Sequence, residues 1–111
     1  MTVKYYKLIC YVPTSHIELV KKALFSVGCG RVGDYSHCGW TAQGVGQFIP
    51  NTVATPFIGQ AGDVSYVDEL RFETLVRANC IRQAVAALVD AHPYEEPAYD
   101  IVALVTLEEL P

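Results

Sequence analysis

The apolar and polar positions of the chain follow two different periods, and each period predicts one kind of element. Residues 4–12 alternate with a period of two, as in a strand that carries apolar side chains on both faces. The segment 66–77 alternates in the same way, with charged residues along one face at its start. Residues 99–106 follow a proline-containing turn and are rich in apolar residues, so they predict a further strand.

The segment after residue 13 repeats its apolar residues at the spacing of an amphipathic helix. Its apolar face consists of Ile17, Val20, Leu24 and Val27. Ser15 and Glu18 have the spacing of a capping box at the helix start, and Lys22 follows Glu18 at the spacing of an ion pair. Gly28 is expected to end this helix, since glycine is common just beyond a helix C-terminus.

A second amphipathic helix is predicted after Asn79, a candidate N-cap. Its apolar face consists of Ile81, Ala84, Val85, Leu88 and Val89. The helix has to end before Pro93, because the proline ring would clash with the preceding turn.

The segment 28–63 holds all eight glycines of the chain. Within it, two apolar patches, YSHCGW and VGQFIP, are interpreted as short strands that form a hairpin. Residues 51–63 then form an irregular loop that is longer than a simple connection requires. We expect this loop either to be functional or to cover a surface.

The order of these elements is strand, helix, strand pair, strand, helix, strand. It predicts an α+β fold of the ferredoxin-like βαββαβ kind, with an extra hairpin and a long loop after the first helix. At 111 residues, the chain is expected to form one domain over 1–111. Both helices should cover the same face of an antiparallel sheet.

The other face of this sheet is predicted to be apolar. The residues expected there are Tyr5, Ile9, Tyr11, Leu75, Val102 and Leu104. Burying roughly 600 Å² of such a face would contribute on the order of 15 kcal/mol, before the costs of association. We therefore expect the protein to associate with copies of itself.

Composition narrows the class of protein. The net charge of -4, with Lys and Arg residues scattered singly, gives no basic surface for a nucleic acid. No apolar run is long enough to span a membrane, and the N-terminal segment lacks the pattern of a signal peptide. The four cysteines have no zinc-type spacing and are expected to be free thiols in a reducing compartment. A cytoplasmic protein is predicted.

Several motifs, in this order along the chain, resemble one known family. They are GRVGDYSHCGW, GQFIP, PFIG, VDELRFE and HPYEEPAYDI. Together they resemble the YqfO-type insert domain of the dinuclear-metal proteins known as NGG-one-interacting factor three. The last third of the chain also resembles the CutA family, whose final helix runs into a similar turn and closing strand.

The resemblance implies a CutA-like and PII-like fold, which is usually a homotrimer in those groups. In full-length members, this domain is inserted between two halves that carry a paired metal site. The resemblance therefore assigns the ligands of that site to no residue of this chain. The family also carries the label GTP cyclohydrolase type 2.

The stretch HPYEEP offers a first candidate site, formed by His92, Tyr94, Glu95 and Glu96. An imidazole beside carboxylates suits zinc binding or proton transfer. The same residues also suit a stiff turn, in which Pro93 and Pro97 restrict the backbone and His92 caps the preceding helix. Both interpretations stay open at this stage.

The glycine-rich segment offers a second set of candidate ligand-binding residues, Arg31, Asp34, His37 and Trp40. Backbone amides between the glycines could hold an anion there. His37, Cys38 and His92 are the candidate metal ligands, for a divalent ion as the cofactor, if the fold brings them together. Phe48 and Phe57 could line a pocket or pack the loop.

Two functions follow from these observations. The first is an oligomeric binding or regulatory module that uses the glycine-rich loop and the HPYEEP turn, with a small molecule or a protein as its ligand. The second is a metal-dependent hydrolase-like enzyme, which requires His37, His92, Glu95 and Glu96 to converge in one cleft. No complete catalytic set is apparent in the sequence, so we favour the first.

Overall fold

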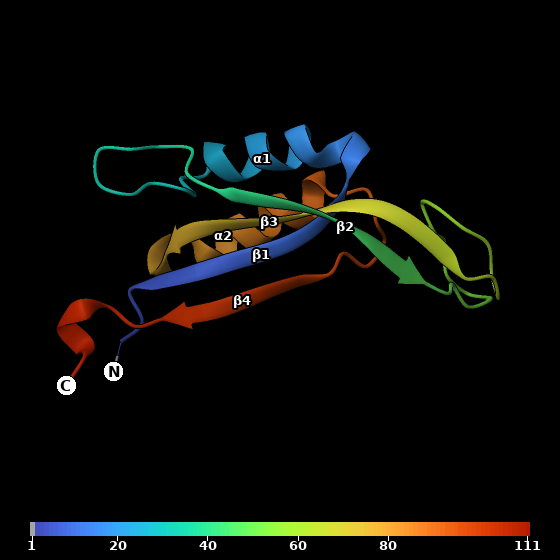
Figure 1. The fold of residues 1–111 in the computed structure, drawn as a ribbon. Helices are drawn as coiled ribbons and strands as arrows, with labels where there is room; N and C mark the ends of the chain where they lie inside the picture. Colours follow the sequence, from blue (N-terminus) through green and yellow to red (C-terminus); the bar gives the residue numbers. More distant parts are fainter. Residues whose placement is uncertain (1) are drawn as a thin grey trace.

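The computed structural model describes residues 2–111, and within this range the elements follow the order β1-α1-β2-β3-α2-β4 (Figure 1). The strands are β1 (Tyr5–Pro13), β2 (Trp40–Phe48), β3 (Ser65–Arg77) and β4 (Tyr99–Leu104). The helices are α1 (Ile17–Ser26) and α2 (Ile81–Ala91). Short 3-10 helices cover Thr14–His16, Ala78–Cys80 and Leu107–Glu109. No helix in the described range is long and apolar enough to cross a membrane.

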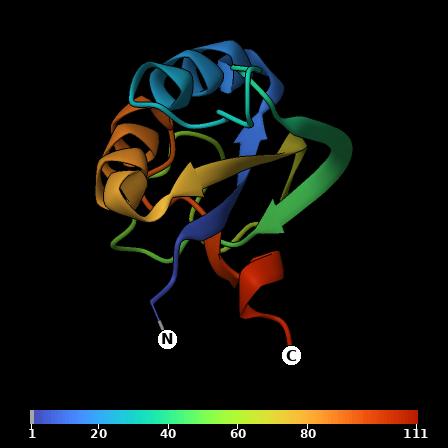
Figure 2. The ribbon, with the colours of Figure 1, turned by 90° about the vertical axis from the view of Figure 1, so that its left-hand side faces the viewer.

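The strands form one antiparallel sheet in the order β2-β3-β1-β4. β1 lies inside the sheet, where Leu8 pairs with Thr74 of β3 on one side and with Ile101 of β4 on the other. Both helices lie on the same side of this sheet (Figure 2). This arrangement confirms the predicted α+β, ferredoxin-like βαββαβ fold.

The core lies between the two helices and the sheet. Its fully buried side chains include Leu8, Cys10, Val12, Val20, Leu24, Phe72, Val76, Ala84 and Leu88. These residues come from the predicted apolar faces of β1, α1, β3 and α2, so the two periods in the sequence identified the core correctly. Val89 is an exception, since it is 46% exposed on the outer side of α2.

The helices cover only part of the length of the sheet. An α-helix of 11 residues, such as α2, is about 16 Å long, whereas a strand of 13 residues, such as β3, extends over roughly 43 Å. The β2–β3 hairpin therefore extends beyond the helices as an arm, with the loop 49–64 at its end (Figure 1).

The extra hairpin that the two apolar patches predicted does not form. VGQFIP belongs mostly to β2, which pairs with β3 from Trp40↔Glu73 to Phe48↔Ser65. YSHCGW instead lies mostly in a loop, where the described backbone has one isolated bridge, between Val32 and Tyr35. His37 has a φ of 58°, a left-handed conformation that interrupts an extended strand.

Two predicted N-caps are also wrong. α1 begins after a 3-10 turn without a side-chain cap, and Ser15 Oγ is bonded to Nδ1 of its neighbour His16 at 2.8 Å. α2 likewise begins after a 3-10 turn, where Asn79 accepts a hydrogen bond from the Cys80 thiol. In both places the 3-10 turn ends in the residue that precedes the helix, and this displaces the candidate cap from the N-cap position.

The predicted end of α1 is confirmed. Gly28 has a φ of 99°, and its N–H donates to the carbonyl of Phe25, while the N–H of Cys29 donates to that of Leu24. This is the Schellman pattern that a glycine beyond the helix C-terminus permits. The ion pair on α1 differs from the prediction, because Glu18 contacts Lys21 at 3.9 Å and not Lys22.

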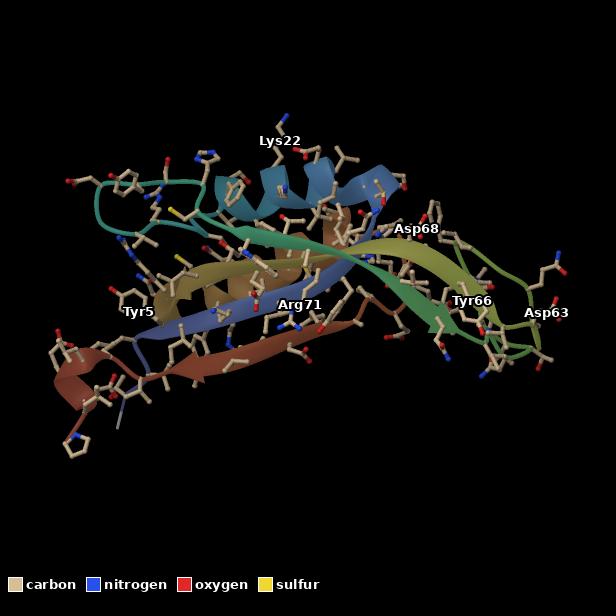
Figure 3. The ribbon with its side chains drawn as sticks, in the orientation of Figure 1. Tyr5, Lys22, Asp63, Tyr66, Asp68 and Arg71 are labelled. Carbon is tan, nitrogen blue, oxygen red and sulfur yellow. The ribbon has the colours of Figure 1, made fainter. Side chains whose placement is uncertain are left out.

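The strand register confirms that the predicted apolar residues share the face turned away from the helices. Tyr5 pairs with both Leu104 and Arg77, and residues two positions apart on a strand point to the same face, so Leu75 and Val102 lie on the face of Tyr5. This face is more polar than expected near its middle. Arg71 lies there, on the side of the sheet away from α1 (Figure 3), paired with Glu73 at 3.1 Å and with its guanidinium 6.0 Å from the ring centre of Tyr11. Lys7, between Leu75 and Val102, and Asp100 of β4 also lie on this face.

Gly30 is the position where the loop 28–39 depends most on glycine. It has a φ of 77°, its N–H donates to the carbonyl of Leu75, and a Cβ there would lie 2.6 Å from the carbonyl oxygen of Cys38. We expect Gly30→Ala to lower the free energy of unfolding by about 3 kcal/mol, from left-handed strain plus overpacking. Urea unfolding measures this effect.

Gly33→Ala is the matched control. Gly33 also has a positive φ of 56°, but a Cβ there meets no atom within 4 Å, so only the backbone strain of about 1 kcal/mol applies. Equal effects of the two substitutions would show that the close approach of Gly30 to Cys38 contributes nothing.

Candidate functional site

The long loop and the HPYEEP turn meet at one pocket. It has a volume of about 460 Å³ and lies between the end of β2, the loop 49–64 and the turn 92–98. Its walls are mainly apolar, and the aromatic residues among them are Tyr11, Phe48, Phe57 and Tyr94. A pocket of this size, apolar with a few polar groups, has the usual form of a small-molecule site.

A direct hydrogen bond joins the loop to the turn. Both carboxylate oxygens of Glu95 accept from the backbone N–H of Thr55, at 3.1 and 3.3 Å. These residues are 40 positions apart in the sequence. The bond is exposed, yet it connects the two walls across the pocket.

A second polar contact crosses from the turn to β3. The hydroxyl of Tyr94 donates to Oε2 of Glu69 at 2.7 Å, and the Tyr94 ring packs against Phe48 with 6.1 Å between ring centres. Burial, together with this hydrogen bond to Glu69, raises the pKa of the Tyr94 hydroxyl above its usual range. Tyr94 therefore stays protonated and acts as a hydrogen-bond donor.

His92 connects the turn to β1 through hydrogen bonds of its ring. Its ring is 5% exposed, Nε2 donates to the carbonyl of Tyr11 at 2.7 Å, and Nδ1 accepts from the backbone N–H of Tyr94 at 3.1 Å. A carbonyl can only accept and an N–H can only donate, so this ring is the neutral, Nε2-protonated tautomer. Both ring nitrogens are in use, which leaves neither as a ligand or base in this conformation.

Burial also determines the ionisation of His92. It lowers the pKa of the imidazole from its ordinary value of 6.5, against the opposing effects of the Tyr11 carbonyl and Glu69. Protonation at Nδ1 would place two donors face to face, His92 Nδ1–H and the Tyr94 N–H. The neutral ring is therefore part of the structure of the turn.

The structure divides the candidate residues between two ends of the molecule. His92, Tyr94, Glu95 and Glu96 lie at the pocket or beneath it. Arg31 instead lines a groove that runs from the end of α1 along α2 as far as Asp90. The rest of the second set is also on the loop 28–39 or at the start of β2, where Asp34 is exposed, Trp40 is 58% exposed and the His37 ring contacts Phe25.

The candidate metal ligands are not brought together within one chain. His37 contacts the last turn of α1, which adjoins the start of α2, whereas His92 follows the end of α2. The two histidines therefore lie near opposite ends of α2, a helix about 16 Å long. Cys38 lies beside His37 and donates to the carbonyl of Ser36. Among residues 2–111, no group of three or more His, Cys, Asp or Glu side chains could hold an ion.

Two of the pocket residues that carry polar groups, Tyr11 and Glu69, were not among the site residues expected from the sequence, and Phe48 and Phe57 were expected either to line a pocket or to pack the loop. All four line the pocket. Glu69 belongs to the charged face of β3, so its polarity was visible, but its position beside Tyr94 depends on contacts between distant segments. Phe57 also packs edge-on against His16, with 5.4 Å between ring centres. Its side chain therefore both lines the pocket and packs the loop against the start of α1.

The fold places the chain among CutA-like and PII-like domains. CutA from Archaeoglobus fulgidus aligns with a TM-score of 0.66 and 13% identity, covering 95% of this chain and 89% of that one. PII from Arabidopsis thaliana, solved with citrate, aligns with a TM-score of 0.61 and 13% identity, covering 93% and 77%. At such identities the likeness shows the fold alone.

Sequence comparison finds relatives among the proteins called GTP cyclohydrolase 1 type 2 homolog. The one from Mycobacterium tuberculosis is 48% identical over 99 residues, and the one from Bacillus subtilis 43% over 95 residues. These alignments cover 89% and 86% of this chain but 26% of each relative, so the chain spans about a quarter of their length. No family model matches the sequence.

A solved structure connects these findings. The Bacillus cereus protein related to NIF3 aligns with a TM-score of 0.79 and 38% identity, covering 96% of this chain and 27% of that protein. The chain is therefore homologous to one part of the NIF3-related proteins, the NGG-one-interacting factor three group that the motifs indicated.

The neutral state of His92 predicts a pH dependence of stability. The pKa is lower in the folded than in the unfolded chain, so the unfolded chain binds more protons as the pH falls below about 6.5. The contribution of neutral His92 to the free energy of unfolding should be complete above that pH, and the free energy of unfolding should decrease below it. Urea unfolding between pH 8 and pH 5 measures this trend.

Two substitutions isolate the contribution of His92. His92→Gln should flatten the decrease, whereas His37→Gln, a change in an exposed loop, should retain it. A decrease of the same size in His92→Gln and in the unchanged protein would assign the effect to other groups.

Proposed function

We propose that this chain is a binding or regulatory module that takes a small ligand in the pocket between the loop 49–64 and the turn 92–98. Within the proposal, the chain corresponds to the YqfO-type insert domain of the NIF3-related proteins and acts as a homo-oligomer, with a trimer favoured, in the cytoplasm. Its relatives carry the name GTP cyclohydrolase 1 type 2 homolog over about four times its length.

One observation carries the proposal. Two segments that the sequence separates by 40 residues are joined through Glu95 and Thr55 around a pocket of about 460 Å³. The apolar walls supply contact area, and the carboxylates and backbone groups at the edge supply orientation. A ligand that contacts both walls would bias the position of the arm, which is how a binding module passes on a signal.

A neutral aromatic probe tests the pocket. We expect benzyl alcohol to shift the backbone amide NMR signals of Ile49, Thr55 and Glu95, and Ala54→Trp to abolish these shifts, because Ala54 lines the pocket and the indole would fill it. Ala86→Trp, which fills the groove at the opposite end, is the control and should leave them unchanged. Shifts that persist in Ala54→Trp, or that appear only along residues 28–39, would contradict the proposed site.

Self-association is supported by the sheet face that the helices leave uncovered. Val102 on this face is 44% exposed, and Leu104, Tyr5 and Leu75 of the same face are only partly buried within one chain. Apolar side chains that gather on one sheet face typically pack against a partner. Copies of the same chain are the partner we propose.

A charge on this face should separate the copies. Val102→Glu is expected to convert the oligomer to a monomer in light scattering, because each copy would have to bury an additional carboxylate at the interface. Leu19→Glu is the control, since Leu19 is 60% exposed on α1, away from the sheet face. A monomeric unsubstituted protein would refute the proposed association.

The metal-dependent hydrolase-like enzyme has less support. It requires His37 to join His92, Glu95 and Glu96, and the structure separates His37 from the other three by the length of α2. The ring nitrogens of His92 are also occupied by backbone groups.

A further inference from the structure

The charged groups of the pocket are all of one sign. Glu69, Glu95 and Glu96 line it, and none of its described lining residues is Lys or Arg. A concave site with charges of one sign and apolar walls concentrates ligands of the opposite sign. This wall composition distinguishes the pocket from the groove at the other end of the molecule, which Arg31 and Arg77 line together with Asp90.

Aromatic rings add a second attraction for a cation. Phe48 and Tyr94 pack at an angle of 55° and, together with Phe57 and Tyr11, contribute to the walls. The face of an aromatic ring attracts ammonium groups, and aromatic cages recognise such ligands in other proteins. Rings combined with carboxylates therefore favour an organic cation over an anion.

The three carboxylates differ in their exposure and in the hydrogen bonds that they already accept. Glu95, which binds the Thr55 N–H, and Glu96 are both exposed to solvent at the edge. Glu69 is half-buried and accepts one hydrogen bond, from Tyr94, while a carboxylate offers about four acceptor positions. Glu69 is thus the group that can accept from an ammonium inside the pocket.

Gly46 makes room for this carboxylate. It pairs with Val67 on β3 and is the diagonal neighbour of Glu69, and a Cβ at this position would collide with Oε1 of Glu69. Gly44, two residues earlier on the same strand, would meet no atom within 4 Å. The absence of a side chain at Gly46 therefore has a specific consequence, which is the placement of the Glu69 carboxylate against β2 and toward the pocket.

We propose that the pocket binds an organic amine, with its ammonium group on Glu69 and its apolar body between Phe48 and Phe57. This inference rests on the proposed function, since it assigns a ligand class to the same pocket. A metal ion fits less well, because the three carboxylates are spread along the walls and form no ligand group. The ammonium instead needs one carboxylate and nearby ring faces.

Three probes of similar size and different charge test the inference. Benzylamine, benzyl alcohol and benzoate share one ring and carry a positive, zero and negative charge at pH 7. In NMR titrations of the full chain, we expect benzylamine to bind about tenfold more tightly than benzyl alcohol, from one charge-assisted hydrogen bond. Benzoate should bind most weakly.

The variants assign this preference to Glu69. Glu69→Gln should remove the tenfold preference but retain binding of benzyl alcohol, because glutamine still accepts from Tyr94. Gly46→Ala should reduce the preference without any change in charge, whereas Gly44→Ala should not. Glu108→Gln, which is exposed and paired with Lys4 just before the start of β1, removes the same charge at the end of β1 away from the pocket and should leave the preference unchanged.

The outcomes separate the two proposals. Equal binding of the three probes, tighter binding of benzoate, or a preference that survives Glu69→Gln would overturn the amine inference and leave the pocket as a ligand site. Binding of none of the three probes at the pocket would overturn both.

Discussion

The structure depends on a mismatch of length between its helices and its sheet. α1 and α2 have 10 and 11 residues and cover about 15 Å of a sheet whose longest strand has 13 residues. Beyond the helices lies the β2–β3 arm, and the strand residues that line the pocket there, Tyr11, Phe48 and Glu69, share the sheet face turned away from the helices. The loop 49–64 and the turn 92–98 meet at this end of the sheet, and the pocket lies between them and the end of β2.

The turn can take this position because its polar groups are satisfied within the protein. His92 is buried beneath it and bonds to the backbone of both β1 and the turn, and Tyr94 reaches β3 through Glu69. Each of these bonds connects an element of the core to the wall of the pocket. His92, which first suggested catalysis, thus holds the turn in place, while Tyr94, Glu95 and Glu96 line the pocket together with Glu69.

The sequence predicted those features that depend on a few neighbouring residues. The strand and helix periods identified the buried faces, and Gly28 marked the end of α1. The predicted caps were wrong because 3-10 turns precede both helices, and the predicted extra hairpin was wrong because His37 adopts a left-handed backbone conformation. In each case local propensity was outweighed by the path that the chain takes to reach its tertiary neighbours.

The amino-acid sequence by itself determined the order of the elements, the core and the two segments that offer candidate site residues. Those properties arise from side-chain periodicity and backbone conformation, which act over a few residues. Only the tertiary structure decided that Thr55 meets Glu95, that Glu69 meets Tyr94, and that His37 stays apart from His92. Such pairings depend on strand register and on the length of the arm, and no local pattern encodes them.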